Sequence, residues 1–203
     1  MGNGKIKADI EMKYTLSLFL IIALYLTACA LSPQTVIINP DLQVAKNAAA
    51  TKAITLSLDI TDIRSSNIIG QRGGVYESTS HITTGENTTS NLQKTLARAF
   101  TDVGYIVTGK GESADAKLII EISDIKYFAH SEKVIQSIET KVVIRAICWK
   151  NNQEYTGTYS ATRKKDVLTT PTVAENERLV NEALGVVLQR VLEDEELFLF
   201  IDG

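Results

Sequence analysis

The spacing of hydrophobic residues changes along this chain, and each spacing predicts a different kind of element. Residues 54–61, ITLSLDIT, alternate between apolar and polar positions, a period of two that predicts a half-buried strand. Residues 88–104 instead carry apolar side chains at helical spacing and end at Gly104, a residue type that favours a helix C-terminus. The apolar positions of this predicted helix are Leu92, Leu96, Phe100 and Val103.

Three further runs predict consecutive strands over 116–128, 134–149 and 154–165. In the first run the apolar positions shift phase by one residue, which predicts a bulge near Asp124. Asn151-Asn152 separates the second run from the third, and asparagine tolerates the positive φ of a tight hairpin. The three strands are therefore expected to form an antiparallel meander.

A second amphipathic helix is predicted near the C-terminus. Thr172 and Glu175 have the spacing of a capping box, and four apolar residues after them share a helix face, namely Val180, Leu184, Val187 and Val191. Packing both helices on one face of the sheet is the simplest way to bury their apolar sides. The predicted fold class is α+β, a two-layer sandwich in which a mostly antiparallel sheet carries two amphipathic helices on one face.

The apolar run from about Tyr14 to Ala30 predicts a secretion signal that ends at a lipid attachment site. It falls short of the roughly 20 strongly apolar residues that a spanning helix needs, and lysines precede it. Leu26-Thr27-Ala28-Cys29 resembles the lipobox of bacterial lipoproteins, in which Cys29 receives a diacylglyceryl group and cleavage follows Ala28. The cysteine is the required residue because its thiolate is the nucleophile. A plain signal peptide and a single-pass anchor remain alternatives, and Met12 is an alternative start.

The lipobox predicts where the mature protein resides. In such lipoproteins an Asp after the cysteine favours retention in the inner membrane, and residue 30 is Ala. The expected location is therefore the outer membrane of a Gram-negative bacterium, with the domain facing the periplasm. Two or more acyl chains bind a membrane stably, whereas one chain binds reversibly. The expected partner of Cys29 is thus the membrane, through its N-terminal acyl chains.

These predictions divide the chain into three parts. Residues 1–28 form the signal peptide, 29–53 the lipidated N-terminus and a tether, and 54–203 a single α+β domain. A 25-residue tether reaches ~80 Å when extended and ~28 Å as a coil. Residues 35–39, TVIIN, lie inside the tether and are apolar enough to dock as an edge strand.

Charge and cysteine content exclude several function classes. The chain has 21 Lys and Arg against 24 Asp and Glu, and removal of residues 1–28 leaves 18 against 22. Without a basic excess, nucleic-acid binding is not expected. Cys148 is the only thiol besides Cys29, so neither an internal disulfide nor a cysteine metal site is predicted. A buried inert thiol is favoured over an intermolecular bridge, and no metal or other cofactor is expected.

A candidate polar site lies at the end of the first predicted strand. Asp62 and Arg64 are two residues apart, so their side chains are expected on one face beside the glycine-containing stretch at Gly70. The pair either recognises a polar partner or holds the loop in place. Neither GQRGG nor TGKGES has the pattern of a phosphate-binding loop. The two histidines, His81 and His130, lie in predicted loops without a nucleophile elbow, so an enzyme is not expected.

The C-terminal stretch is a second candidate interaction surface. Residues 197–201 are apolar and follow an acidic cluster, and the candidates in it are Leu197, Phe198 and Phe200. The segment is interpreted either as a terminal strand or helical turn docked on the core, or as an exposed patch for a partner.

The order of these motifs resembles the YajG family of bacterial lipoproteins. The resemblance rests on the lipobox, Asp62-x-Arg64, Ile69-Gly70, Gly104-Tyr105 and the ending VLEDEELFLFI, and it covers essentially the whole mature chain. The extra N-terminal residues and the tether sequence depart from the family pattern. The resemblance implies an envelope lipoprotein facing the periplasm, and it brings no catalytic residues.

Two functions are therefore expected. The favoured one is a non-catalytic, lipid-anchored interaction module that assembles with envelope proteins in a larger complex. The alternative is a lipoprotein that binds a small ligand or lipid in a pocket between sheet and helices.

Overall fold

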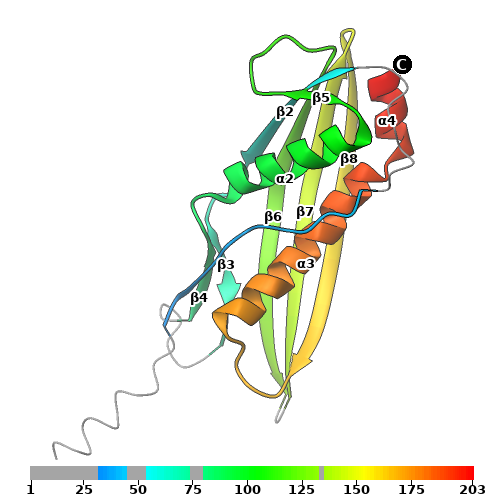
Figure 1. Cartoon of the computed structure of the whole chain (residues 1–203). Coiled ribbons are helices and arrows are strands. Elements are labelled where there is room, and N and C mark those ends of the chain that lie inside the picture. Colours follow the sequence, from blue (N-terminus) through cyan, green and yellow to red (C-terminus); the bar gives the residue numbers. More distant parts are fainter. Residues whose placement is uncertain (1–31, 45–53, 74–79, 133–134) are drawn as a thin grey trace, which may run out of the picture.

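The computed structural model describes residues 32–44, 54–73, 80–132 and 135–203. Within these ranges an eight-stranded sheet carries three helices (Figure 1). The strands are β1 (Gln34–Val36), β2 (Thr55–Asp62), β3 (Ile68–Gln71), β4 (His81–Thr84), β5 (Ile106–Thr108), β6 (Ala116–Glu132), β7 (Ile135–Lys150) and β8 (Gln153–Val167). The helices are α2 (Thr88–Val103), α3 (Val173–Leu192) and α4 (Glu195–Asp202).

Strand β6 organises the sheet because it is long enough to take two partners on one edge. On its other edge β7 pairs with it antiparallel along its whole length, and β8 pairs antiparallel with β7, which confirms the predicted meander. On the first edge β2 pairs in parallel with residues 116–122 of β6, and β3 pairs in parallel at Tyr127. Strands β2 and β3 therefore lie end to end along β6.

The prediction of a mostly antiparallel, two-layer sandwich is wrong in these details. Four of the seven strand pairings are parallel: β1–β4, β2–β5, β2–β6 and β3–β6. The β2–β5 and β2–β6 pairings are parallel because α2 intervenes between β2 and these two neighbours, so the chain returns to the same end of the sheet before β5 and β6. Periodicity identifies strands but does not identify their partners.

Helices α2 and α3 lie over the same face of the sheet (Figure 1). The predicted apolar positions of both helices are buried, with Phe100 and Leu184 fully inaccessible. Gly104 ends α2 in the left-handed conformation with φ 114°, and Thr172 with Glu175 forms the predicted capping box of α3. At the start of α2, Asn87 is the N-cap without a side-chain capping bond.

Two predicted backbone irregularities are confirmed. The β6–β7 register shifts between Ile122 and Asp124, where the phase shift of the sequence predicts a bulge. The β7–β8 turn places Asn151 and Asn152 at φ 51° and 61°. Such positive values suit a tight hairpin between twisted strands.

The segment before residue 45 belongs to the domain rather than to a free tether. Residues 34–36 pair with β4, as the apolar TVIIN stretch predicts for an edge strand, and the segment continues between α2 and α3 (Figure 1). Val36 and Ile38 are buried at 0% and 1% exposure. The boundary predicted at residue 54 therefore leaves out a packed part of the domain.

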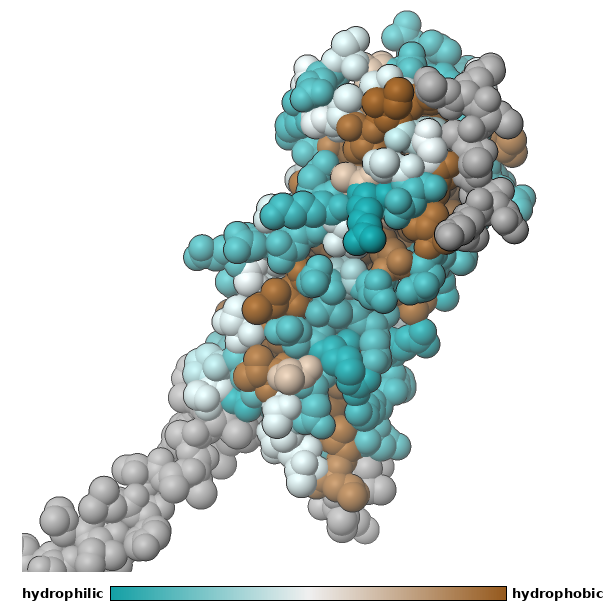
Figure 2. All heavy atoms as spheres, in the orientation of Figure 1, coloured by the Kyte–Doolittle hydropathy of each residue, from teal (hydrophilic) through white to brown (hydrophobic). Residues whose placement is uncertain are grey.

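The surface that carries the helices is mainly hydrophilic, with hydrophobic groups in separate patches (Figure 2). Among the described residues, no helix has the length and apolar character to cross a membrane. The predicted signal peptide, Ala28 and Cys29 lie outside the described residues.

Candidate functional site

A groove opens on the edge of β6 where β2 ends and β3 has not yet begun. Ile63 donates its backbone N–H to the Ile122 carbonyl at 3.2 Å, and the next pairing on this edge is Gly70 with Tyr127. Among the described residues, no strand pairs with residues 123–126 of β6 on this edge. The groove has a volume of about 680 Å³ and is lined by residues from 64–73 and 123–130. We call it the edge groove.

Arg64 forms one wall of the edge groove and is held by its neighbours. Its Nε and Nη2 donate to the two carboxylate oxygens of Asp62 at 2.8 and 2.6 Å, and Nη2 also donates to Thr84 Oγ1 at 3.0 Å. The Arg64 side chain is only 6% exposed, yet its Nη1 has no partner among the described residues. Nη1 is thus a buried, unsatisfied donor, and Arg64 as a residue lines the groove.

The electrostatics of this pair favour the ionised carboxylate. Burial raises the pKa of Asp62, but the hydrogen bonds and charge of Arg64 outweigh burial, so the pKa lies below its ordinary value. The two predicted polar residues thus contact each other, and Asp62 orients Arg64. The pairing also matches the second interpretation, a charge pair that holds the 63–67 loop.

Gly70 lies in the edge groove because only glycine fits there. A Cβ at this position would be 2.0 Å from the Tyr127 carbonyl oxygen, so any other residue would push β3 away from β6. The close approach of the two backbones closes one end of the groove.

The remaining lining mixes apolar and charged groups. Ile68 and Phe128 are large apolar side chains that stay 45% and 41% exposed, and His130 stacks on Phe128 with ring centroids 6.1 Å apart. Lys126 pairs with Asp124 at 2.8 Å. The described residues contain no group of three metal-ligating side chains. The site thus offers hydrogen-bond donors and apolar contact to an extended ligand.

The C-terminal candidates lie in a different place, on α4. Leu197 is fully buried, Phe198 stacks on Tyr105 with centroids 6.0 Å apart, and Phe200 contacts the Tyr155 ring at 5.9 Å. Only Leu199, at 72% exposure, presents a large apolar surface to solvent. The stretch is therefore a docked helix, the first of its two interpretations.

Asp194 fixes α4 to the sheet, and we call the contacts around it the C-terminal corner. Its carboxylate accepts the backbone N–H groups of Glu196 and Leu197 at 3.0 and 3.1 Å and the hydroxyls of Tyr155, at 2.7 Å, and Tyr159. Burial raises the pKa of Asp194, but the two tyrosines and the two backbone donors outweigh it and lower the pKa below its ordinary value.

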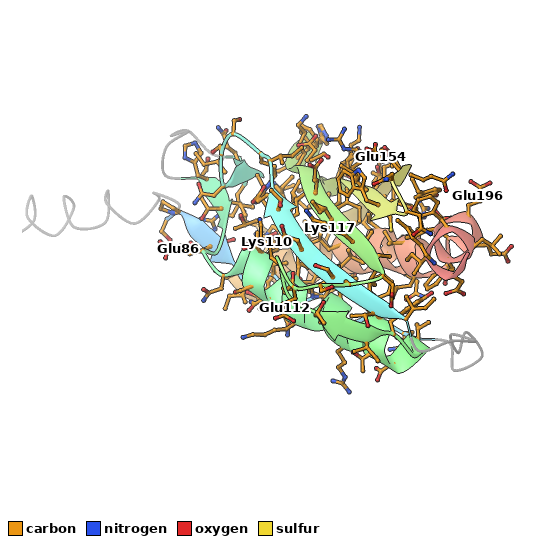
Figure 3. The ribbon with its side chains drawn as sticks, turned by 90° about the horizontal axis from the view of Figure 1, so that it is seen from above. Glu86, Lys110, Glu112, Lys117, Glu154 and Glu196 are labelled. Carbon is orange, nitrogen blue, oxygen red and sulfur yellow. The ribbon has the colours of Figure 1, made fainter. Side chains whose placement is uncertain are left out.

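Acidic groups surround this corner. Figure 3 shows Glu154 and Glu196 on the side of the molecule where α4 lies, and Glu86 on the opposite side. Burial, the hydrogen bond to Asp194 and the nearby Glu196 charge raise the pKa of the Tyr155 hydroxyl. Tyr155 is thus a neutral donor to Asp194 at ordinary pH.

Cys148 is buried at 0% exposure, as predicted for an inert thiol. Burial raises its pKa to about 12, so the thiolate is scarce at neutral pH.

The chain matches the family Lipoprotein_16, described as "Uncharacterized lipoprotein", over residues 40–202. The chain belongs to this lipoprotein family. The description of the family indicates that the chain is a lipoprotein. A sequence search of curated proteins found no match.

One solved structure supports the fold of this lipoprotein. A crystal structure of a Xanthomonas campestris protein has a TM-score of 0.57 at 16% identity, covering 78% of this chain and 91% of that one. A Helicobacter pylori homologue of a neuraminyllactose-binding hemagglutinin has a TM-score of 0.45 at 10% identity, covering 80% and 94%. Lipoprotein GNA1162 of Neisseria meningitidis has a TM-score of 0.35 at 14% identity, covering 70% and 100%. The TM-scores of the Helicobacter pylori and Neisseria meningitidis structures are too low to support an inference about this lipoprotein.

Sequence reasoning found Asp62, Arg64 and Gly70 but missed the opposite wall of the edge groove. That wall comes from β6, around Asp124 and Phe128. The phase shift at Asp124 was the available signal, because a bulge interrupts pairing and re-aims side chains. Thr84, the third partner of Arg64, has no comparable signal in the sequence.

Proposed function

We propose that this lipoprotein is a lipid-anchored, non-catalytic interaction module that binds an extended segment of another envelope protein in the edge groove. The observation that carries the proposal is the interrupted edge of β6 between Ile122 and Tyr127. Beside this edge, Arg64 has a buried Nη1 without a partner among the residues that the structure describes. An extended peptide supplies the hydrogen-bonding groups that the β6 edge lacks.

Strand addition explains how such a segment would bind. Residues 123–126 span about 13 Å at 3.3 Å per residue, which is room for three or four partner residues. Main-chain hydrogen bonds to the β6 edge provide affinity, and contacts with side chains provide selectivity. Arg64 lines the groove that the partner enters, and an apolar partner side chain packs against Ile68 and Phe128.

We further propose that the lipoprotein is YajG-like, acylated on Cys29, and held at the outer membrane facing the periplasm. The lipobox pattern and Ala30 support this location. The motifs that carry the YajG resemblance also have structural roles here: Asp62 pairs with Arg64, Gly70 allows a close backbone approach, and Gly104 caps α2.

The alternative, a small-ligand or lipid binder, has less support. It needs room between the sheet and the helices, and that layer is filled by side chains such as Ile120, Ile144 and Leu184, each 0% exposed. The edge groove is open and partly charged, which suits a peptide better than an acyl chain.

Site-specific photo-cross-linking in cells tests the proposal. A photoreactive phenylalanine analogue replaces Phe128 in the edge groove or, as a matched aromatic control, Trp149 at the far end of β7. In the chain that carries the analogue at position 128, the additional substitution Arg64→Met removes the guanidinium. We expect one envelope protein to cross-link at position 128 and none at position 149. The yield of the cross-linked product at position 128 should fall at least about fivefold with Arg64→Met.

A further variant tests the proposed acylation of Cys29. Cys29→Ser is expected to release the chain from the membrane fraction. Equal cross-linking at 128 and 149, or none at 128, would contradict the groove as a binding site. Unchanged membrane association of Cys29→Ser would contradict the acylation.

A further inference from the structure

The chain enters the domain at a rigidly held point. Arg72 Nη2 donates to the Ser32 carbonyl oxygen. Two residues later, the Gln34 side chain is 6% exposed and accepts from Asn176 Nδ2 at 2.7 Å. Asn176 in turn accepts the Tyr127 hydroxyl at 2.8 Å. These buried bonds tie the start of the described chain to both β6 and α3.

We infer that the end of the domain that carries Ser32 lies directly on the membrane surface, held there by a tether of only a few residues. The inference rests on the proposed acylation of Cys29. Only Ala30 and Leu31 separate Cys29 from Ser32, so the Cα atoms of Cys29 and Ser32 lie at most about 11 Å apart. The headgroup layer on one side of a bilayer is about 5–7 Å thick. Ser32 is therefore kept within a few ångströms of the headgroups.

This short reach replaces the long tether expected from the sequence. A tether of ~80 Å would let the domain adopt any orientation and height. Because residues 34–44 pack between α2 and α3, that length is not free. The domain therefore has a fixed side toward the lipid.

The side chains at this end suit a lipid surface. Gln136, near the start of β7, donates to the Arg72 carbonyl at 3.2 Å and pairs with Val167, so it links the end of β8 to Arg72, which holds Ser32. Leu168 follows and is 80% exposed, the most exposed of the large hydrophobic side chains described. Val173, at the start of α3, is 42% exposed. Apolar side chains at a membrane contact bury their surface among the headgroups and acyl chains.

The opposite end stands away from the membrane. Strand β8 runs from Gln153 to Val167, which at about 3.3 Å per residue places its two ends ~46 Å apart. The C-terminal corner lies toward the Gln153 end, since Tyr155 contacts Asp194. A label at each end of β8 therefore distinguishes an oriented domain from a freely rotating one.

The test uses the full acylated chain in vesicles of phosphatidylethanolamine and phosphatidylglycerol that contain a lipid with a nitroxide headgroup. A fluorophore is attached at Leu168→Cys or, as the matched control on the same strand, at Gln153→Cys. Buried Cys148 does not compete for the label, and acylation blocks Cys29. We expect strong quenching at position 168 and at least about fivefold less at 153.

Lengthening the tether provides the second arm. A ten-residue Gly-Ser insertion after Leu31 raises the mean reach to about 20 Å. We expect quenching at 168 to fall several-fold while vesicle flotation is unchanged. Equal quenching at 168 and 153, or quenching at 168 that ignores the insertion, would overturn the inference alone. Failure of the uninserted chain to float would overturn the proposed anchor, and the inference with it.

Discussion

The edge groove and the C-terminal corner both contain charged side chains held by neighbouring strands, but only the corner is complete. In the corner, Asp194 accepts two backbone and two tyrosine donors, and Leu197 beneath it is fully buried. In the edge groove, within the described part of the chain, Arg64 keeps an unpartnered Nη1 and four residues of β6 have no strand partner on that edge. A satisfied network stabilises the fold, whereas leftover bonding capacity beside exposed apolar groups marks a place for a ligand.

Substitutions in the two regions should have opposite effects on stability and on partner binding. Changes in the C-terminal corner should lower the free energy of unfolding and leave partner cross-linking intact in the molecules that remain folded. Changes in the edge groove should affect stability less and cross-linking more. The expected loss of stability decreases from Leu197 through Asp194 and Gly70 to Arg64.

Leu197→Ala should have the largest effect, a loss of about 3 kcal/mol in the free energy of unfolding, because it leaves a cavity under α4. Leu199→Ala is the matched control on the same helix, and its 72% exposure predicts a change within about 0.5 kcal/mol. Urea titration followed by circular dichroism measures both. Similar losses for the two variants would mean that α4 is not docked as described.

Asp194→Asn should cost about 2 kcal/mol, since an uncharged amide with one acceptor oxygen replaces the carboxylate that accepts two tyrosine hydroxyls and two backbone N–H groups. The lowered pKa of Asp194 also makes its contribution depend on pH. The contribution is complete above the unfolded value of about 4 and is lost as the pH falls through the lower folded value. Urea midpoints from pH 7 to pH 2 should therefore fall less steeply for Asp194→Asn; identical slopes would remove Asp194 from the acid response.

Gly70→Ala should cost about 1–2 kcal/mol, because a Cβ 2.0 Å from the Tyr127 carbonyl forces the short strand β3 to shift. Gly109→Ala is the control, as its Cβ would meet Glu112 at an ordinary 3.6 Å. Thermal unfolding compares the two, and cross-linking at Phe128 should be lost in Gly70→Ala only. Retained cross-linking at full strength would show that the closed end of the groove is not needed.

Arg64→Lys should have the smallest effect on stability, about 1 kcal/mol, since lysine keeps the charge beside Asp62 but loses the bidentate geometry and the bond to Thr84. It also removes the guanidinium that lines the groove, so cross-linking at position 128 should fall several-fold. Lys126→Arg, which alters a groove charge already paired with Asp124, serves as the control. If Arg64→Lys cross-links as well as the unaltered chain, Arg64 acts on the loop rather than on a partner.

The sequence predicts those features that are local in origin. The meander, the bulge near Asp124, the Asn151-Asn152 turn and the α3 capping box each depend on neighbouring residues, and the structure contains all of them. The parallel pairing of β2 with β6 joins residues about 60 positions apart, and the alternation of β2 is the same whichever strand lies beside it. For the same reason Asp62 and Arg64 could be found from their spacing, whereas Thr84 and the β6 wall could not.

The docking of residues 34–44 also sets an order of events during synthesis. The Asn39 N–H bonds to Asn181, which lies 142 residues later in the chain. At about 5–20 residues per second, roughly 7–28 s pass between the two. During that time the segment next to Cys29 has no α3 to bind. Under the proposed acylation of Cys29, the lipid-attaching enzymes would therefore meet an accessible substrate, and the segment would dock on α3 only after the last third of the chain has been made.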